Sequence, residues 1–238
     1  MIKQAAVYTG KAKTVYATDD PELFVMEYRD DATAFNGVKK AALDRKGKVN
    51  NYFNAHVMQV LEHQGIKTHF VKLLSDNESL VKKLDMIKVE CVIRNVVAGG
   101  ISKRLGIEEG MVLPEPTFEF FLKDDALGDP IINESHIHVF KWATDAEVTE
   151  LKRKTFLVND ILKAWFATAG LTLVDFKLEF GRHHGELLLG DEFTLDGCRV
   201  WDAVTQEKFD KDRFRRDLGN VIEFYEAAAK RLGINIPE

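Results

Sequence analysis

Apolar residues are spaced along this chain in two ways: in short clusters bounded by turn residues, and in longer segments with one at every third or fourth position. The short clusters predict strands. In chain order, these strands are expected at residues 5–8, 14–17, 23–28, 68–74, 80–83, 89–97 and 117–123. Residues 30–47 are polar and contain glycine, which predicts a loop.

The longer spacing predicts helices. Residues 49–64 carry an apolar side chain at every fourth position, and Gly65 stands where a C-terminal cap belongs. Residues 101–105 fit a short helical turn. Thr144 and Glu147 form a capping box, which predicts a helix over residues 144–169.

A last helix is predicted from Asp210, a good N-cap, to Leu232. The β-rich first third, followed by mixed strands and long helices, predicts an α+β fold. We expect a small β-rich N-terminal lobe, residues 1–85, and a larger α/β lobe, residues 86–238. No linker-like segment separates the lobes, so they are expected to share an interface.

Composition narrows the class of protein. The 238 residues are 45% hydrophobic and 30% charged, as in soluble globular proteins, and the net charge of −5 argues against a nucleic-acid or membrane partner. No apolar run approaches the roughly 18 residues that span a bilayer, and the N-terminus lacks the features of a signal peptide. A cytoplasmic location is therefore expected. Cys91 and Cys198 lie in no metal-ligand spacing and are expected to be reduced structural thiols.

The segment DFKLEFG, residues 175–181, carries the most chemistry. Alternation places its apolar residues on one face and Asp175, Lys177 and Glu179 on the other, about 7 Å apart. On such a face Glu179 can hold a divalent metal and Lys177 can meet a carboxylate or phosphate. Alternation alone favours a half-exposed strand with cross-strand ion pairs, so the pattern indicates a site without establishing one.

A hairpin then returns the chain past this strand. Its turn is GRHHGE, in which His183 and His184 are expected at the surface, and Asp191 on the returning side can approach Glu179. Two converging carboxylates suit Mg²⁺. His136 and His138 alternate without a third ligand at convincing spacing, so no zinc site is predicted there.

Positive charge gathers in two shorter motifs. GKAK, residues 10–13, can cover a polyphosphate with backbone N–H groups and two lysines, although an exposed turn is the commoner occurrence. Arg94, ahead of Gly99 and Gly100, is placed to bind a phosphate bidentately; the alternative is a surface arginine at a strand end.

The arginines of the last predicted helix have acidic neighbours. Asp212 and Arg216, like Arg213 and Asp217, are four residues apart, which predicts a solvated face of ion pairs. Arg215 has no such partner and is the candidate for a ligand.

Together these segments resemble the SAICAR synthetase (phosphoribosylaminoimidazole-succinocarboxamide synthase) family in its compact bacterial form. The matching runs follow the family's order from Tyr8 to Gly219. They are YTGKAKTVY, DATAFNG, DRKG, VNN, RNVVAGGISKRLG, KDDALGDP, DFKLEFG, LLGDEFTLDGCRVWD and DKDRFRRDLG. Each run is modest evidence alone, whereas their ordered combination over nearly the whole chain is highly specific.

The resemblance implies an ATP-dependent ligase of purine biosynthesis with an ATP-binding cleft between the lobes, Mg²⁺ as cofactor and a homodimeric assembly. ATP phosphorylates the carboxylate of carboxyaminoimidazole ribonucleotide (CAIR), and the amine of L-aspartate displaces the phosphate. By position, the implied ATP-binding residues are Lys11, Ala12, Lys13, Lys82, Met86, Glu179 and Asp191, the last two also holding the metal. The implied catalytic residues are Lys177, Asp175 and Asp196, and Arg94, Arg199 and Arg215 are implied to bind substrate. Aspartate is expected near Lys177 and the DATAFNG loop.

Two departures from the family pattern affect substrate binding. Gly100 stands where the family often has serine, so the expected phosphate contact falls to backbone N–H groups or to Ser102. Asn36 stands where the family often has aspartate, and it carries no charge. Two other functions stay open on the residues alone: a small-molecule kinase, and a nucleotide-binding protein without catalysis. Dependence on aspartate separates the ligase from the kinase, and the intact set Lys177, Glu179 and Asp191 argues against mere binding.

Overall fold

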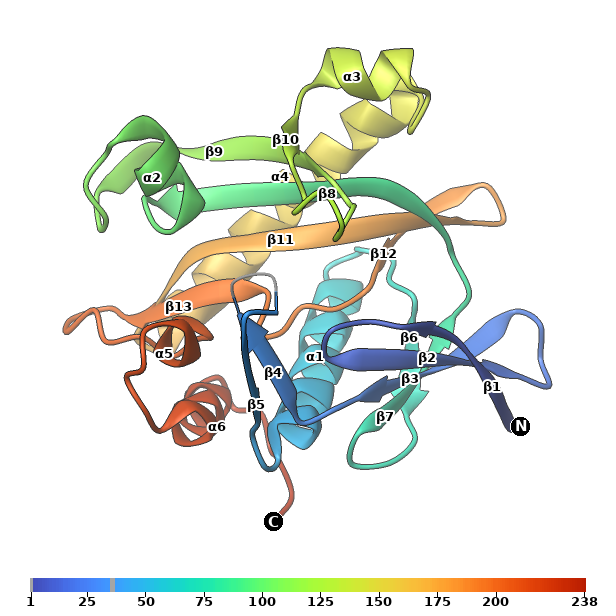
Figure 1. Ribbon diagram of the computed structural model, residues 1–238, viewed down its shortest axis with the longest axis horizontal. Helices are drawn as coiled ribbons and strands as arrows, with labels where there is room; N and C mark the ends of the chain where they lie inside the picture. The colour runs from blue at the N-terminus through green and yellow to red at the C-terminus, as the bar shows by residue number, and fades with distance from the viewer. Residues whose placement is uncertain (1, 35–36) are drawn as a thin grey trace.

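Two antiparallel sheets form the framework of the computed structural model, which describes residues 2–34 and 37–238 (Figure 1). The first sheet has five strands in the order β1-β2-β3-β7-β6. Their bounds are β1 (Lys3–Thr9), β2 (Lys13–Thr18), β3 (Leu23–Tyr28), β7 (Glu78–Lys82) and β6 (Phe70–Leu73). Helix α1 (Lys46–His63) packs against β3, β6 and β7.

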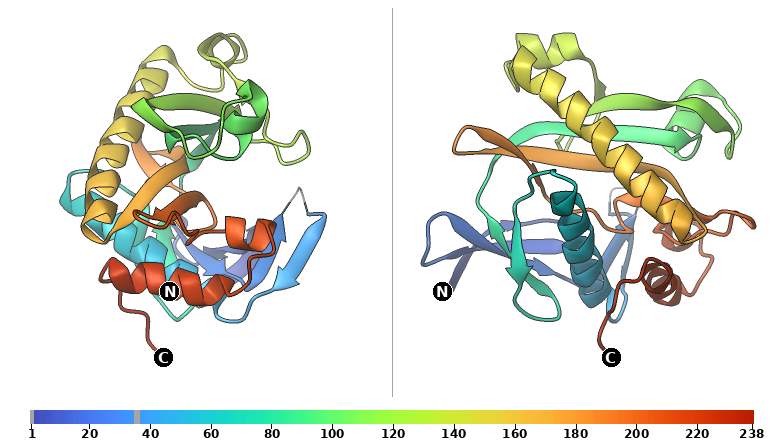
Figure 2. Two further views of the ribbon diagram at one scale, coloured as in Figure 1. Left: turned by 90° about the vertical axis from the view of Figure 1, so that its left-hand side faces the viewer. Right: turned by 180° about the vertical axis from the view of Figure 1, so that it is seen from behind.

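The second sheet has β11 at its centre. Its order is β10-β9-β8-β11-β12, and β13 pairs with β11 as well. The bounds are β10 (Ile131–Ile132), β9 (Val112–Leu122), β8 (Asp85–Val96), β11 (Leu171–His183), β12 (Glu186–Gly190) and β13 (Cys198–Asp202). Figure 2 shows α4 (Asp145–Thr168) lying across this sheet, where it contacts β8 and β11.

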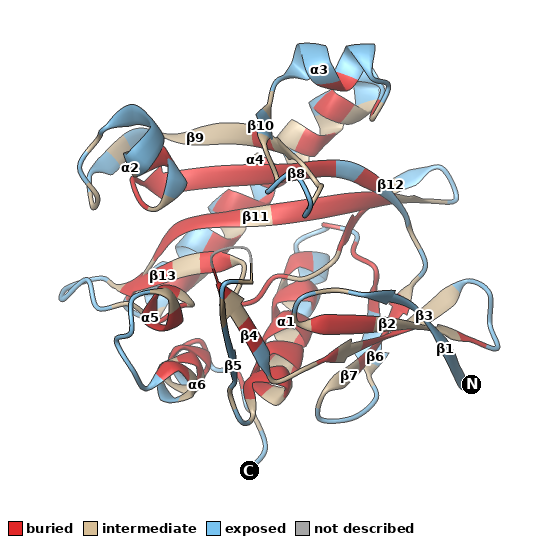
Figure 3. Ribbon diagram, in the orientation of Figure 1, coloured by how far each residue is buried: buried red, intermediate tan, exposed pale blue. Residues whose placement is uncertain are grey.

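The main hydrophobic core lies between this sheet and the helices. The apolar face of β11, with Phe176, Leu178 and Phe180, belongs to the same buried cluster as Leu162 and Phe166 of α4. Figure 3 shows that the central parts of β8 and β11 are buried. Because one face of β11 fills the core, its charged residues must point to the opposite side, as predicted.

Most of the predicted elements are confirmed. Thr144 accepts a hydrogen bond from the N–H of Glu147, and the Glu147 side chain bonds the N–H of Thr144, so the capping box is present. Helix α2 (Gly100–Leu105) occupies the predicted helical turn. The α+β fold class is confirmed. The chain passes from the first sheet to the second between Lys82 and Asp85, while the division into two lobes at residue 85 stays a prediction.

The prediction of a loop over residues 30–47 is wrong in part, because this segment contains a hairpin of β4 (Asp31–Ala34) and β5 (Lys39–Ala42). Alanine, lysine and aspartate are weak strand formers, so these short segments carry no strand signal of their own. Helix α3 (Glu134–Val139) and strand β10 were also not predicted.

The prediction of a single last helix is wrong as well. The chain forms α5 (Asp212–Arg215) and α6 (Val221–Arg231), separated by a turn. Asp217, Gly219 and Asn220 in this turn all have left-handed backbone angles, with φ of 55°, 72° and 51°, which a helix cannot accommodate. Arg213 fixes the turn by donating to the carbonyls of Leu218 and Gly219 at 3.1 and 2.8 Å.

Among the described residues, no helix is both long and apolar enough to cross a bilayer.

Candidate active site

Two adjoining cavities lie where the two sheets meet. The first, of about 460 Å³, has an apolar wall that the first sheet and the connection to β8 provide. The apolar side chains of this wall are Val7, Val15, Phe24, Met26, Val81, Leu84 and Met86. Its other end is charged, with Lys13, Lys177, Glu179 and Asp191. Such a cavity combines a slot for a flat apolar group with a place for anions or a metal ion.

The second cavity, of about 340 Å³, is lined mainly by charged and polar groups. Its charged residues are Lys11, Glu90, Arg94, Asp129, Asp175, Lys177, Asp196, Arg199, Lys211 and Arg215. Thr33, Ala34 and Gly37, at the tip of the β4–β5 hairpin, also line it. Lys11, Lys177, Asp196 and Lys211 border both cavities, so the two form one continuous site.

The register between β11 and β8 assembles the charged floor of this site. Asp175 pairs with Arg94, and Glu179 pairs with Glu90, so residues on the same face alternate along both strands. Lys177, between the two acids of β11, donates to Glu90 at 2.6 Å and to Glu179 at 3.0 Å. The cross-strand ion pairs that alternation favours are therefore real, and they line a cavity. Glu90 was missed because its segment was interpreted as a mostly apolar strand.

Arg94 is a buried arginine and not a surface one, since only 5% of the residue is exposed. It donates to Asp175 at 2.7 Å and to Glu119 of β9 at 2.8 Å. Arg199 of β13 donates to the same Asp175 oxygen at 2.9 Å. Asp175 thus fixes two guanidinium groups at the floor of the second cavity, and its role in the structure is to position them.

Glu179 and Asp191 lie at the charged end of the first cavity, as the hairpin predicted. Lys13 contacts Asp191 and lies 3.1 Å from Glu192. Burial and the negative charge of Asp191 raise the pKa of Glu179, and Lys177 and Lys123 offset part of this rise. Burial alone would raise the pKa of Asp191, but Lys13 and Lys177 outweigh it and lower that pKa to about 2. Strongly perturbed pKa values of this kind cluster at functional sites.

Lys177 remains a cation in this environment. Burial by itself would lower the pKa of its ammonium group, but Glu179 and Glu90 outweigh burial and raise that pKa well above its ordinary value. Its chemistry is therefore charge stabilisation, because a group that holds its proton so firmly is a poor general base.

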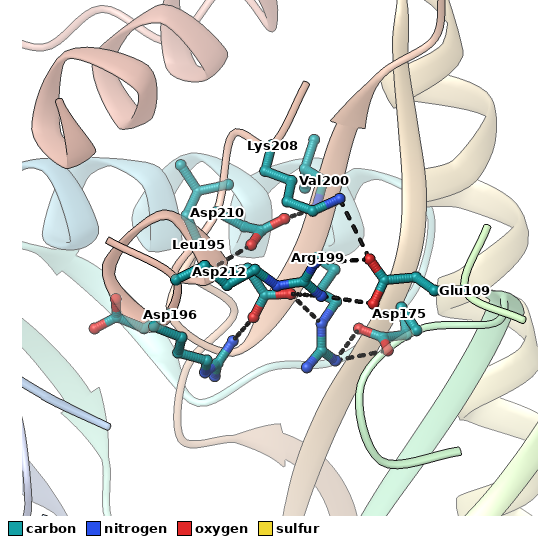
Figure 4. A network of polar contacts seen from close by, with 12 residues as sticks. Glu109, Asp175, Leu195, Asp196, Arg199, Val200, Lys208, Asp210 and Asp212 are labelled. Atoms are coloured by element: carbon teal, nitrogen blue, oxygen red, sulfur yellow. Dashed lines mark hydrogen bonds and ion pairs between the residues drawn. The ribbon is translucent and has the colours of Figure 1, made fainter. Parts of the chain in front are cut away.

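Arg199 and Arg215 are held by one carboxylate, Asp212 of α5 (Figure 4). Asp212 accepts from Arg199 at 2.9 Å and from Arg215 at 2.6 Å. The fully buried Asp210 next to it accepts the N–H of Val200 at 2.8 Å and the N–H of Asp212 at 2.7 Å. Asp210 therefore ties β13 to α5 and keeps both arginines at the cavity.

The expected ion pairs of the last helix need correction. Arg215 has a partner after all, one turn back, whereas Arg216 lies 3.6 Å from Asp212 and makes its shorter contact, 2.5 Å, with Glu109. Asp217 pairs with Lys39 at 2.5 Å instead of with Arg213. The predicted Asp212–Arg216 pair is therefore present, whereas the left-handed backbone at Asp217 removes the predicted pair between Arg213 and Asp217.

Asp196 borders both cavities, but its strongest contacts are internal. Lys46 of α1 lies 2.6 Å from it, and Tyr225 of α6 donates to it at 2.8 Å. Burial would raise the pKa of Asp196, but Lys46 and Lys211 outweigh burial and lower it. The permanent negative charge of Asp196 joins two helices to the site floor, which suits a positioning role better than proton transfer.

The remaining expected residues divide between the cavities and α2. Lys11, Ala12, Lys82 and Met86, which the resemblance implies to bind ATP, all line the first cavity. Ser102 lies in α2, where its hydroxyl donates to the carbonyl of Ile107 at 2.7 Å. That bond favours backbone groups near Gly100 as the replacement for the family's serine. Asn36 lies outside the described residues.

Comparisons with known proteins agree with this geometry. The family model for SAICAR synthetase matches residues 6–232. A phosphoribosylaminoimidazole-succinocarboxamide synthase from Hahella chejuensis is 62% identical over 234 residues, covering 98% of this chain and 99% of the relative. A protein of the same name from Idiomarina loihiensis is 61% identical over 236 residues, covering 99% of this chain and 100% of the relative.

Solved structures are similar over the same length. The synthase from Ehrlichia chaffeensis has a TM-score of 0.95 at 44% identity, covering 98% of this chain and 100% of that one. A SAICAR synthetase in complex with ADP has a TM-score of 0.93 at 45% identity, covering 97% and 99%. Fold and site define the class as enzymes of two antiparallel sheets with adjoining cavities where the sheets meet. More particularly, the chain belongs to the SAICAR synthetase family.

Asp210 gives the first testable prediction. Burial and the charge of Asp212 raise the pKa of the Asp210 carboxyl from 3.8 to about 7. Between these values the folded protein holds a proton that the unfolded chain has released, so this group's contribution to the free energy of unfolding falls as pH rises. The slope is at most about 1.4 kcal/mol per pH unit.

In Asp210→Asn this contribution disappears, and we expect a flatter stability profile between about pH 5 and 7 in urea unfolding. Asp160→Asn, an exposed position on α4, is the matched control and should retain the wild-type profile. An Asp210→Asn profile parallel to the wild type would contradict the assignment.

Proposed function

We propose that the protein joins L-aspartate to the carboxylate of CAIR at the expense of ATP, giving SAICAR, ADP and phosphate. The observation that carries this proposal is the pair of adjoining cavities, one with an apolar slot and one lined by arginines, on a shared floor of Lys177 and neighbouring acids. One site thereby offers space for a nucleotide beside space for a second anionic substrate.

The first cavity suits the nucleotide. Its apolar wall matches a purine ring, and Lys11 and Lys13 lie where the phosphates would follow. The similar structure that contains ADP supports a nucleotide at this fold. Lys13 and Asp191 form an ion pair in this structure. On substrate binding, phosphate oxygens would take the place of Asp191 beside Lys13, and a metal ion would take the place of Lys13 beside Asp191.

Glu179 and Asp191 fit a Mg²⁺ ion, which takes one or two carboxylates together with phosphate oxygens and water. Burial and the charge of Asp191 raise the pKa of Glu179, and a bound divalent cation would offset the negative charge of both acids. When bound, the ion supplies charge neutralisation for the transferring phosphoryl group. The two carboxylates would hold the ion in the first cavity, where Glu179 lies beside Lys177.

The second cavity suits CAIR. Its phosphate and carboxylate are anions, and Arg94, Arg199 and Arg215 are oriented in advance by Asp175 and Asp212. Aspartate is placed near Lys177 and the β4–β5 hairpin, whose tip lines this cavity. The homodimer and the cytoplasmic location implied by the resemblance stay predictions.

The proposed reaction has two steps, phosphorylation of CAIR and formation of the amide bond. A carboxylate oxygen of CAIR attacks the γ-phosphorus of ATP, forming an acyl phosphate while the bond to ADP breaks. The amine of aspartate next attacks the acyl carbon, and phosphate leaves with the electron pair of the broken C–O bond and takes up the proton that the nitrogen releases. Lys177 offsets negative charge in both steps, and the fixed arginines hold the acceptor in line.

A kinase acting on a small molecule would use the same nucleotide cavity. Aspartate separates the two functions, because a kinase has no use for an amine acceptor. We expect the purified protein with ATP, Mg²⁺, CAIR and aspartate to form ADP and the succinocarboxamide, which chromatography measures. Omission of aspartate should abolish amide formation. ADP release without any amide in the complete mixture would overturn the ligase proposal.

The metal assignment predicts the effect of two isosteric variants. Glu179→Gln and Asp191→Asn should each lower turnover roughly 100-fold or more, because the metal loses a charged ligand. Asparagine tolerates the left-handed φ of 52° at position 191, so the backbone is preserved. Glu186→Gln, exposed on the same hairpin, is the control. Wild-type dependence on Mg²⁺ concentration in both site variants would refute the assignment.

Variants of two neighbouring arginines can distinguish a substrate-binding side chain from one that only forms a surface ion pair. Arg215 lines the second cavity, whereas Arg216 bonds to Glu109. We expect Arg215→Ala to raise the KM for CAIR roughly tenfold or more, because a charge-assisted hydrogen bond is worth about 1.5–3 kcal/mol. Arg216→Ala should leave this KM near the wild-type value. Equal KM values in the two variants would remove Arg215 from the substrate site.

A further inference from the structure

Three metal-ligating side chains meet at the surface, away from the charged floor. His183 is the last residue of β11, His184 follows it in the turn to β12, and Glu22 lies in the turn between β2 and β3. The Nε2 atom of His184 is 2.9 Å from a carboxylate oxygen of Glu22. One ligand atom from each of the three residues lies within 4.8 Å of the others.

The backbone of the turn brings two consecutive histidines together. His184 and Gly185 both have left-handed φ angles, 49° and 81°, as the two central residues of a tight hairpin turn require. The imidazole centroids of His183 and His184 are consequently 4.2 Å apart. In a regular strand the two rings would point to opposite faces.

One of the histidines is already oriented as a ligand. Nδ1 of His183 lies 3.1 Å from the carbonyl oxygen of Lys83, and a carbonyl oxygen only accepts, so Nδ1 carries the proton. Nε2 of the neutral ring then has a free lone pair. A backbone carbonyl on the second ring nitrogen is the usual support of a metal-bound histidine. Lys83 in turn donates its N–H to the carbonyl of Glu22 at 2.8 Å, which holds the turns together.

We propose that His183, His184 and Glu22 bind a divalent first-row transition ion of the Zn²⁺ class, with water as the fourth ligand. Two imidazole nitrogens and one carboxylate are ligands that such ions prefer, whereas Mg²⁺ prefers oxygen. Tetrahedral bonds of about 2.0–2.1 Å place ligand atoms roughly 3.4 Å apart. The three ligand atoms now lie within 4.8 Å of one another, and rotations of these half-exposed and exposed side chains would bring them to this spacing.

The location gives such an ion a structural consequence. The ion would bridge the β2–β3 turn of the first sheet and the β11–β12 turn of the second. Between these turns runs the connection from β7 to β8. Leu84 of this connection lines the first cavity, as do Lys82 at the end of β7 and Met86 at the start of β8. A bound ion therefore clamps the two sheets at the edge of the nucleotide cavity. This inference concerns a different set of ligands from Glu179 and Asp191 and does not depend on the proposed reaction.

The test is calorimetric titration of Zn²⁺ into chelator-treated protein without an affinity tag. Excess Mg²⁺ is present to occupy the oxygen ligands of the active site. We expect one Zn²⁺ site whose affinity falls at least tenfold in His183→Ala and in His184→Ala. His138→Ala is the matched control, since His138 also pairs with a carboxylate, Asp145 at 2.9 Å, on the exposed surface.

Thermal unfolding provides a second measurement. Zn²⁺ should raise the Tm of the wild type and of His138→Ala, because a ligand that binds only the folded state stabilises it, and should leave the Tm of His184→Ala unchanged. Without Zn²⁺ the variants should melt close to the wild type. An unchanged Zn²⁺ affinity in both site variants, or an equal loss in His138→Ala, would overturn the proposal.

Discussion

The pairing of β11 with β8 is the interaction on which the rest of the structure depends. One register places Phe176 and Leu178 in the core, and it sets Asp175 opposite Arg94 and Glu179 opposite Glu90. A slip by one residue would exchange the two faces, burying charge in the core and exposing phenylalanine to the cavities. The core and the site are therefore specified by the same alternation, and burial of the apolar face fixes the chemistry of the other.

Burying several carboxylates on this face of the sheet is electrostatically unfavourable, and lysines of the same site offset the cost. Glu90, Glu179 and Asp191 converge in a buried region, and Lys13, Lys123 and Lys177 neutralise them without substrate. Buried charges are tolerated only where partners and hydrogen bonds compensate for lost water. The lysines are therefore fixed in place before any anion arrives. Preorganised cations of this kind stabilise developing charge without having to reorient during the reaction.

The parts that were predictable from sequence are those whose signal is local. Helices α1 and α4 follow from apolar spacing and caps, and the charged face of β11 from strict alternation. Glu90 escaped because β8 is buried over most of its length and shows little alternation, so its role is visible only once β11 lies beside it. The break before α6 escaped because apolar spacing does not reveal the left-handed angles of Asp217 and Asn220, which Arg213 stabilises through carbonyls five and six residues further on. Partners brought together by tertiary structure leave no periodic trace.

Strand β11 can line both cavities because the connection from β7 to β8 packs closely against it. A side chain at Gly181 would place its Cβ 2.6 Å from the Cβ of Leu84, and one at Gly190 would lie 2.9 Å from the same residue. Glycine at these two positions lets the connection from β7 to β8 lie directly on the β11–β12 hairpin. The apolar wall that Leu84 and Met86 form is consequently held against the strand that carries Lys177 and Glu179. The shape of the first cavity therefore depends on the packing of Leu84 and Met86 against these two glycines as much as on the charged residues themselves.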